Sequence, residues 1–357
     1  MQKLKKAAYP DTPIKKEEIV LLEKIKAETE RHNLNNITRT EAYLSFYKIH
    51  PEIHWAFLAH MVSRNTGWHM TDLKGSLLPY LLAPDECRAF YSFLERGNWL
   101  IFNDAYPQLL LYEESKKQKR KLFHLLKQFH VSVFMKAVWD YFFDHPSSSV
   151  LPVALIINEQ NHLEAHTMQN ADFQAAVFNN PAFAIQDLFS MNQILFPYIH
   201  DGKIKFDGIT VHRFKDVDQR ISIGKSLYAL LFSSPDYTEK VMEWANSQRH
   251  TASRKDFWPE LFNTVKTDRP AKLYIPRVQD CSVKKDAAKL YSPTLTAVWK
   301  NQQHAEPLPV EWYTFPEMVS HLSPVQNARV HEFRKEYCAT IEKLELAIAG
   351  KSILSNL

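Results

Sequence analysis

The chain has 357 residues, of which 45% are hydrophobic and 13% are aromatic, so it carries enough apolar side chains to build a packed core. A net charge of +4 is too small to identify nucleic acid as the partner. Only 7 glycines are present and few segments alternate as strands do, which disfavours a sandwich or a doubly wound sheet. We therefore predict an all-α fold, a mostly helical body with at most one small β-hairpin and an irregular wrap rich in proline and aromatic residues.

The periodic segments divide one predicted domain, residues 1–357, into four parts. These are a surface helix in 1–35, a helical core in 36–263, the irregular wrap in 264–322 and a C-terminal helix in 323–350. The wrap is too aromatic to be a disordered linker. The last helix is predicted from a capping box that begins at Ser323 and from Gly350, a typical helix stop.

Cysteine usage and the lack of long apolar runs bear on the compartment. Cys87, Cys281 and Cys338 are odd in number and form no C-x-x-C pair for zinc or for a redox disulfide. No segment reaches the roughly 18 apolar residues of a membrane span, and no export signal is evident. We predict a cytoplasmic protein with reduced thiols, no metal site and no identifiable cofactor.

Residues 36–75 are densely polar and aromatic, and we predict two helices joined by a kink. Thr38 and Glu41 form a T-x-x-E capping box that predicts a helix start. The helix should end before Pro51, whose ring suits the first turn of the next helix. The polar residues singled out near the end of the second helix are His60, Arg64, Asn65, Trp68 and Asp72.

Two interpretations of this polar group stay open. In the first, it is a solvated helix end and His60 is satisfied by a backbone carbonyl group. In the second, Gly67 supplies a tight turn that brings the side chains together under Trp68. Only the second interpretation makes the group a binding or catalytic site.

Helices are predicted next at Pro84–Gly97 and between Pro107 and His145, from helical spacing of the apolar residues. Near the start of the second, five cations fall within seven residues. Such a run is usually a solvated face, and contact with a polyanion or an anionic membrane is the alternative. The candidate contacts are Lys116, Lys117, Lys119, Arg120 and Lys121.

The helix predicted from Leu151 carries Glu159, His162 and His166 on the face that begins as apolar core. Glu159 and His162 form one E-x-x-H pair, as in helical di-iron proteins, but the second pair that such proteins need is missing. A hydrogen-bonded polar cluster in the core is therefore the favoured interpretation over a metal site.

Three further predictions cover the rest of the core. Phe173–Ile199 is predicted as a buried helix, and residues 203–211 as a hairpin that turns at Asp207-Gly208. Gly224-Lys225-Ser226 lacks the earlier glycine of a phosphate-binding loop, so we interpret Gly224 as a point of close helix packing.

Four strings of the sequence carry a resemblance to a known family: TRTEAY, HPEIHWAFLAHMVSRNTGWHMTDLKG, INEQNHLE and RISIGKSLYALLF. They resemble an uncharacterised YppC-like family of Gram-positive, spore-forming bacteria, a domain of unknown function. The resemblance implies a bacterial, cytosolic protein. It implies no activity, substrate or catalytic residue.

Two functions of different class remain. The favoured one is a helical binding or interaction protein without its own catalysis, with an unknown protein or small-molecule partner. The alternative is an enzyme, or a protein that binds a small ligand or a metal, with an internal polar site formed by residues 60–72 and 159–166. These differ in one observable, because an internal site requires the two segments to meet in one cavity.

Overall fold

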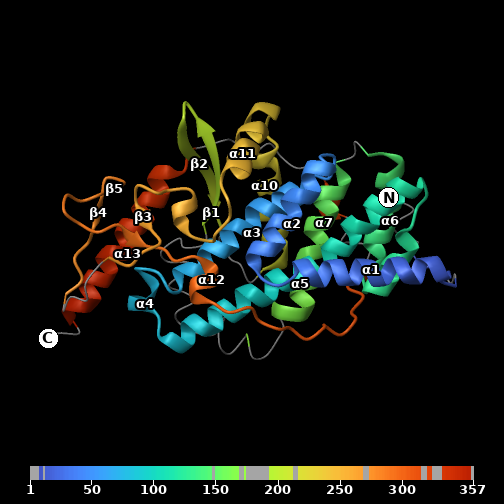
Figure 1. Ribbon diagram of the computed structural model, residues 1–357, viewed down its shortest axis with the longest axis horizontal. Helices are drawn as coiled ribbons and strands as arrows, with labels where there is room; N and C mark the ends of the chain where they lie inside the picture. Colours follow the sequence, from blue (N-terminus) through green and yellow to red (C-terminus); the bar gives the residue numbers. More distant parts are fainter. Residues whose placement is uncertain are drawn as a thin grey trace.

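The computed structural model describes the following residues: 8–10, 13–146, 149–168, 173, 193–211, 216–267, 273–314, 320–323 and 332–354. These form a mostly helical protein, as predicted, with a long body of packed helices (Figure 1). Among the described residues, no helix combines the length and hydrophobicity needed to cross a membrane.

The helices follow one another with short connections through the first half of the chain. The longer ones are α1 (Lys16–His32), α2 (Asn36–Ile49), α3 (His54–Asp72), α5 (Pro84–Gln118), α6 (Val133–Asp144), α7 (Val150–Leu163), α10 (Val217–Leu231), α11 (Pro235–Ser247) and α13 (Arg334–Leu354). The shorter ones are α4 (Leu78–Leu81), η2 (Phe123–Phe129), the π-helical η3 (Glu164–Met168), η5 (Arg254–Asp256) and α12 (Leu295–Val298).

The strands described form three separate pairs, and the hairpin of β1 (Gln193–His200) with β2 (Lys203–Thr210) is the longest. In the later part of the chain, short strands pair as β3 (Phe262–Asn263) with β6 (Leu290–Tyr291) and β4 (Val278–Gln279) with β5 (Ser282–Val283).

The helix α2 begins at a cap that differs from the prediction. Asn35, not Thr38, caps α2, because its side-chain oxygen accepts the backbone amides of Ile37 and Thr38. Thr38 completes a capping box by returning its hydroxyl oxygen to the amide of Asn35. The helix ends at Ile49, before Pro51, as predicted.

Gly67 lies inside α3, so the turn that the second interpretation of the polar group requires at this position is wrong. A Cβ atom added there would lie 2.3 Å from Oδ1 of Asn36 and 2.9 Å from Nε2 of His250. The glycine therefore lets α2 and the chain after α11 approach the helix closely, while the helix itself continues to Asp72.

Gly97 is likewise not a helix stop, since α5 runs through both Gly97 and Pro107 to Gln118. Its buried face continues on both sides of the glycine, for example at Phe93 and Leu100, and this packing holds the helix together. The predicted single helix up to His145 is in fact the end of α5, then η2 and α6, separated first by the left-handed Lys119.

The β1–β2 hairpin turns at Asp201-Gly202, where both residues have positive φ as a type I′ turn requires. Asp207 pairs with Phe196 in the ladder, so the turn predicted at Asp207-Gly208 is wrong. The helix predicted over Phe173–Ile199 is also wrong at its end, because β1 begins at Gln193. Most of the remainder of that helix lies outside the described residues.

The C-terminal helix α13 begins at Arg334 and ends at Leu354, so Gly350 is not its stop. A Cβ atom added at Gly350 would have no neighbour within 4 Å, and the helix continues past this exposed position. The capping box predicted from Ser323 extends into residues 324–331, which lie outside the described part of the chain.

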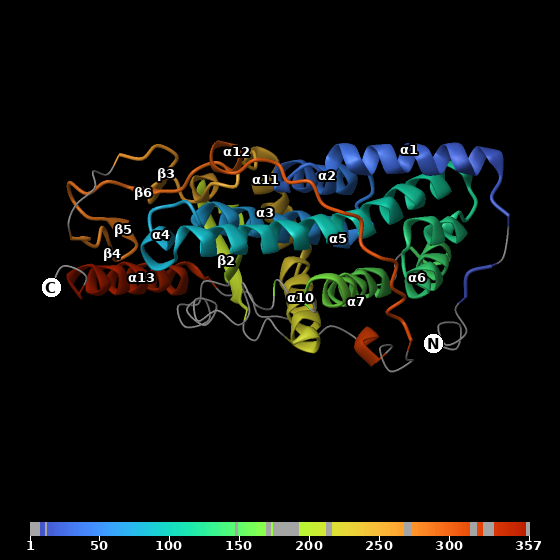
Figure 2. The same cartoon turned by 90° about the horizontal axis from the view of Figure 1, so that it is seen from below.

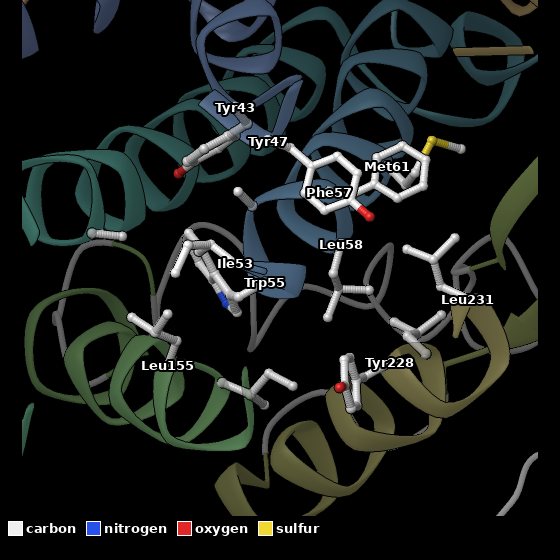
Figure 3. Close-up of a cluster of buried hydrophobic side chains, with 14 of the residues drawn as sticks. Tyr43, Tyr47, Ile53, Trp55, Phe57, Leu58, Met61, Leu155, Tyr228 and Leu231 are labelled. Atoms are coloured by element: carbon white, nitrogen blue, oxygen red, sulfur yellow. The ribbon is translucent and has the colours of Figure 1, made fainter. Parts of the chain in front are cut away.

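One buried hydrophobic cluster connects residues from Leu22 to Ile341. Figure 3 shows its central part, where Tyr43, Trp55 and Leu58 of the α2–α3 pair face Leu155 of α7 and Tyr228 of α10. Gly224 makes this packing possible, because an added Cβ atom would lie 2.6 Å from Cγ2 of Ile156. The prediction of close helix packing at Gly224 is confirmed.

The part of the irregular wrap that follows α12 runs along the helical body and is drawn in orange in Figure 2. Trp299 donates to the carbonyl of Met70 at 2.8 Å, and the Trp312 indole donates to Oδ1 of Asn158 at 3.0 Å. Trp299 also stacks on Tyr91 of α5, with ring centroids 4.0 Å apart. Aromatic side chains therefore hold the described part of the wrap against the helices.

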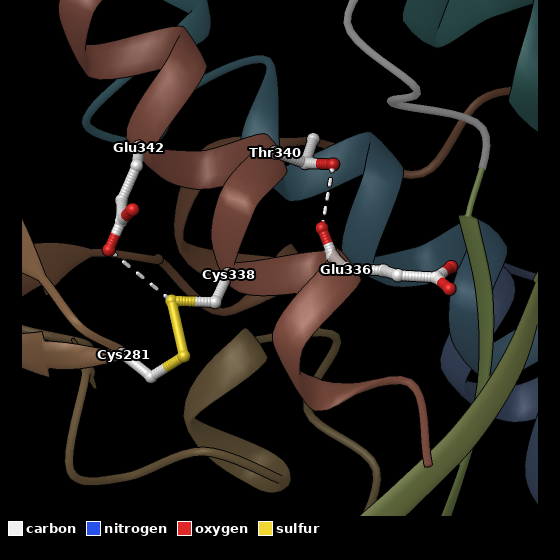
Figure 4. Close-up of a disulfide and its surroundings, with 5 residues drawn as sticks. All are labelled: Cys281, Glu336, Cys338, Thr340 and Glu342. Carbon is white, nitrogen blue, oxygen red and sulfur yellow. Dashed lines mark hydrogen bonds between the residues drawn. A yellow bond between two sulfur atoms is a disulfide. The ribbon is translucent and has the colours of Figure 1, made fainter. Parts of the chain in front are cut away.

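Cys281 and Cys338 form a disulfide between the β4–β5 turn and α13, so the prediction of three reduced thiols is wrong (Figure 4). Their Cα atoms lie 5.4 Å apart, within the range that a disulfide spans, although 57 residues separate them in sequence. Spacing alone could not reveal this pair, because the fold brings its members together. Cys87 is a buried free thiol.

Candidate functional site

A cavity of about 240 Å³ lies between α3, α5, α7 and α10, with β1 at one side. We call it the helical cavity. Residues from both segments singled out in the sequence line it: Ser63, Asn65, Thr66 and His69 from the first, and Glu159, Gln160 and Leu163 from the second. The two segments thus meet in one concavity, although most of the polar side chains proposed for the site lie elsewhere.

The helical cavity is elongated along α3. Its wall on this helix consists of residues spaced three or four apart, from Trp55 through Leu58, Ala59, Val62 and Thr66 to His69. At about 1.5 Å per residue, this stripe is about 20 Å long. Matching stripes come from α5, between Phe90 and Ile101, and from α10, between Arg220 and Leu227.

Most of the wall is apolar, and it includes two glycines on the facing helices. Gly97 of α5 and Gly224 of α10 both line the cavity. At Gly97 an added Cβ atom would meet only Cδ2 of Leu163, at 3.6 Å. The space beside Gly97 is therefore open enough to accept a larger side chain.

Glu159 is the most unusual polar group of the wall. Its carboxylate oxygens accept the Trp55 indole N–H at 3.2 Å and the Gln160 amide at 3.1 Å. Burial raises the pKa of Glu159 to about 8, against the smaller opposing effect of these hydrogen bonds. Near neutral pH the carboxyl group is therefore mostly protonated and uncharged.

The Tyr43 hydroxyl belongs to the same end of the cavity. Tyr43 is 2% exposed, and its oxygen has no hydrogen-bond partner among the described residues. Burial, followed by the nearby carboxyl of Glu159, raises the pKa of Tyr43 well above its ordinary value. Both groups therefore stay uncharged near neutral pH.

His69 stands at the other end of the helical cavity. Burial, and then the charge of Arg254, lower the pKa of His69 to about 3, so the imidazole is neutral. His69 and Leu94 also line a second, smaller cavity of about 110 Å³, which we call the Arg254 cavity. The two cavities therefore share part of their walls.

The Arg254 cavity contains Asp72, one of the residues proposed from the sequence. Arg254 of η5 donates from Nε and Nη2 to the Asp72 carboxylate at 2.6–2.9 Å, which ties the end of α3 to the chain after α11. The Arg254 guanidinium also lies 5.3 Å from the centroid of the Tyr337 ring. Sequence reasoning missed Arg254, because its partner is 182 residues away.

His60, Arg64 and Trp68 lie on another face of α3 and do not line either cavity. His60 Nδ1 contacts the carbonyl of Thr40 at 2.8 Å, as the first interpretation expects, but His60 is 1% exposed, so the solvated helix end of that interpretation is wrong. Arg64 donates to the carbonyl groups of Ala245 and Gln248 at the end of α11 and lies 4.5 Å from the centroid of the Trp244 ring. These contacts are structural.

Asn65 lines the helical cavity and also joins α3 to β1. Its amide nitrogen donates to the carbonyl of Leu195 at 2.8 Å, and its oxygen accepts the Leu195 amide at 2.8 Å. His162 and His166 pack edge to face, with centroids 4.6 Å apart, outside the lining of this cavity. Burial lowers the pKa of both histidines to about 4.

Metal-ligating side chains do not gather at these positions: within the described ranges, no group of three or more His, Cys, Asp or Glu residues is placed to hold a metal ion.

Four cations of the lysine run form ion pairs with acids of the same chain. Lys116 pairs with Glu52 at 2.7 Å, Lys117 with Glu113 at 3.1 Å, Arg120 with Glu18 at 3.6 Å and Lys121 with Asp144 at 2.6 Å. Lys119 is exposed in a left-handed conformation at the end of α5. Exposed pairs of this kind are weak and exchange partners readily, so contact with a polyanion stays a prediction.

Comparison with known proteins places the chain in a family. It is 44% identical over 247 residues to "Uncharacterized protein YppC" of Bacillus subtilis (strain 168), which covers 69% of this chain and 76% of that protein. No solved structure matches it. The model of the family described as "Protein of unknown function (DUF2515)" matches residues 31–329, which include every described residue of the helical cavity. The chain belongs to this DUF2515 family of proteins of unknown function.

Proposed function

We propose that the protein binds an extended, mainly apolar small molecule in the helical cavity. The observation that carries the proposal is the shape of the cavity, whose wall follows α3 from Trp55 to His69 over about 20 Å. An elongated, mostly apolar space is complementary to a chain-like ligand, because burying apolar surface contributes about 25 cal/mol per Å².

The protonation states of the side chains that line the cavity favour a ligand whose middle part is uncharged. Glu159 at one end has its pKa raised to about 8, and His69 at the other has its pKa lowered to about 3. The guanidinium of Arg220 is paired with Glu164 at 2.6 Å. A ligand that carries a charge in the middle of the cavity would lose its hydration without gaining an opposite charge.

The proposal is tested with straight-chain alcohols of eight to eighteen carbons, added to the full chain. A ligand that binds only the folded protein raises the melting temperature, and at a hundred times its Kd it stabilises the protein by about 2.7 kcal/mol. We expect stabilisation to increase with chain length up to the length that fills the cavity and then to fall. Isothermal titration calorimetry gives the Kd of the best alcohol.

A variant that fills the cavity supplies the second arm. Gly97→Leu places a side chain into the open space beside Leu163 and should weaken binding of the best alcohol by about ten-fold or more. Gly350→Leu is the matched control, because Gly350 is also helical but has open space around it. The proposal is contradicted if no alcohol binds at millimolar concentration, or if the Gly97→Leu protein binds as well as the control.

The cytoplasm is the compartment we propose, and the Cys281–Cys338 disulfide makes this part of the proposal testable. Disulfides rarely persist in a reducing cytosol, so the oxidised fraction of this pair in intact cells tests the compartment. Trapping of free thiols before lysis, followed by mass spectrometry, measures the oxidised fraction. A fully oxidised pair would contradict the proposed compartment.

A further inference from the structure

Glu159 is enclosed by the helices and yet keeps accessible surface. It lines the helical cavity and stays partly exposed, whereas its neighbours Tyr43 and Trp55 are only 2% and 1% exposed. Burial is nevertheless the largest cause of its raised pKa, so this surface does not open to bulk solvent. The accessible part of Glu159 therefore faces the helical cavity.

The Glu159 carboxyl group has hydrogen-bonding capacity to spare. An ionised carboxylate accepts about four hydrogen bonds, and two come from the described residues: the Trp55 indole binds Oε2 at 3.2 Å and the Gln160 amide binds Oε1 at 3.1 Å. The amide oxygen of a glutamine at this position would accept the Trp55 N–H as well. What a glutamate adds to the cavity is the ability to ionise.

The groups that face Glu159 supply no positive charge to an ionised carboxylate. Tyr43 of α2 is uncharged, and Asp104 of α5 is a second acid that raises the pKa of Glu159 further. Arg220 of α10 also lines the cavity, but its guanidinium binds the Glu164 carboxylate at 2.6 Å. The described part of the chain thus offers Glu159 no counter-ion.

A cationic amine has the properties that this position lacks. Ionising a carboxyl group in apolar surroundings is costly unless a cation lies beside it. A primary ammonium group brings that charge together with three N–H donors for the two carboxylate oxygens. A hydroxyl group can form a hydrogen bond with the protonated acid, but it draws no benefit from the ability of Glu159 to ionise.

We propose that the ligand of the helical cavity ends in a protonated primary amine, which forms an ion pair with the Glu159 carboxylate while its chain lies along α3. The inference rests on the proposed function and names the head group of that ligand. In the free protein the Glu159 carboxyl group keeps its proton. When the ammonium group binds, the O–H bond of Glu159 breaks and its proton leaves to the solvent, while the amine keeps its own protons.

The test compares decylamine with decanol by isothermal titration calorimetry of the full chain at pH 6, 7 and 8. Alkylamines stay protonated over this range, because their pKa lies near that of lysine, about 10.4. Since Glu159 must lose its proton, the affinity for decylamine should rise about ten-fold from pH 6 to pH 7 and about five-fold from pH 7 to pH 8. The affinity for decanol should not rise.

Calorimetry in buffers of different ionisation enthalpy counts the proton directly. At pH 6 the wild type should release close to one proton for each decylamine bound and none for decanol. Glu159→Gln keeps the hydrogen bond from Trp55 but cannot ionise. It should lose the proton release and the rise with pH, and at pH 8 it should bind decylamine at least about ten-fold more weakly, with decanol binding retained.

Glu243→Gln is the matched control, because it removes the same charge at an exposed position of α11 and should bind both probes as the wild type does. If decylamine binds no tighter than decanol at pH 8, or if Glu159→Gln still releases a proton, the amine head group is wrong while the chain site stands. If neither probe binds, both proposals fall.

Should Glu159→Gln not fold, the infrared difference spectrum of the wild type decides the question. Binding of decylamine at pH 6 should replace the band of a protonated carboxyl group by the bands of a carboxylate. A protonated carboxyl group that persists in the complex would overturn the ion pair.

Discussion

Three of the four helical glycines in the described part of the chain differ in the space around them, and adding a methyl group at each tests that space. At Gly97 of α5 the new Cβ atom would make only an ordinary contact at 3.6 Å. Alanine costs less backbone entropy than glycine in a helix, so Gly97→Ala should stabilise the protein by about 0.5–1 kcal/mol. At Gly224 and Gly67 the new atom would lie 2.6 Å and 2.3 Å from its nearest neighbour.

We expect Gly224→Ala to cost about 1–3 kcal/mol, because Ile156 is fully buried and must shift. Gly67→Ala should cost at least as much, since Asn36, His250 and Ala252 all lie within 3.0 Å of the new atom. Urea denaturation of the three variants measures the free energy of unfolding, with Gly350→Ala as an exposed helical control. If Gly97→Ala destabilises the protein, or if Gly224→Ala does not, the inferred packing around these two glycines is wrong.

Glu159 makes the stability depend on pH in a defined direction. Its pKa rises from about 4.5 to about 8 on folding, so the folded protein holds a proton that the unfolded chain releases above pH 4.5. The free energy of unfolding should therefore fall as the pH rises toward 8, by about 1.4 kcal/mol per pH unit for this one group. Buried histidines such as His162 act in the opposite sense below pH 6.5.

Glu159 contributes most of the slope between pH 7 and pH 8, because Asp104, whose pKa burial raises to about 7, has already lost half of its proton at pH 7. Glu159→Gln keeps the shape and the hydrogen bond from Trp55 but cannot ionise, so its stability should change much less across this window than that of the wild type. Asp104→Asn should keep most of the wild-type slope there. Equal slopes in the wild type and in Glu159→Gln would show that Glu159 is ionised in the folded protein.

At the level of single residues, the sequence indicated which helices carry polar groups but not what those groups contact. Glu159 was identified from its helical face, yet its partner Trp55 is 104 residues away. Tyr43, Gln193 and Arg254 had no local signal, because each belongs to its cavity only through long-range packing. Helical spacing determines a direction on one helix, whereas a cavity requires several helices to be placed relative to each other.

Two buried arginines hold helices together by different chemistry. Arg39 of α2 donates to the Glu95 carboxylate of α5 at 2.5 Å, and both side chains are inaccessible to solvent. Arg64 of α3 donates hydrogen bonds to backbone carbonyl groups at the end of α11 and lies against the Trp244 ring. Removing Arg39 strands a buried carboxylate, whereas removing Arg64 leaves carbonyl groups that a water molecule can reach more cheaply.

We therefore expect Arg39→Met to destabilise the protein by about 3–5 kcal/mol and Arg64→Met by about 1–3 kcal/mol. Thermal and urea unfolding of the two variants provide the comparison. Because Arg64 does not line either cavity, Arg64→Met should also retain the affinity of the wild type for a chain-like ligand. Loss of binding in a well-folded Arg64→Met protein would return Arg64 to the candidate site.

Helix ends were predicted well where a neighbouring residue in the sequence sets them, and poorly where tertiary packing sets them. Pro51 follows the end of α2 as predicted, since its ring restricts the residue before it. Gly67, Gly97 and Gly350 were predicted as a turn or as stops, yet all three are helical. A glycine ends a helix only when the chain needs a left-handed residue there, and that need is set by tertiary contacts.

At the C-terminal end of the molecule, α13 is held by contacts with a segment that is far from it in sequence. Glu345 of α13 accepts the backbone amides of Arg277 and Val278 and the Tyr274 hydroxyl. The Cys281–Cys338 disulfide joins the same two segments (Figure 4). Periodicity predicts that α13 exists, but not that the wrap docks against it, because the wrap itself has no repeating pattern.

The disulfide gives a measurable property of the whole chain. Titration of the denatured, unreduced protein should find one free thiol, Cys87, and three after reduction. Because the bond closes a loop of 57 residues, reducing it should lower the free energy of unfolding by about 2–4 kcal/mol. Cys338→Ser with Cys281→Ser should match the reduced wild type. If reduction leaves the stability unchanged, the hydrogen bonds of Glu345 alone hold α13 to the wrap.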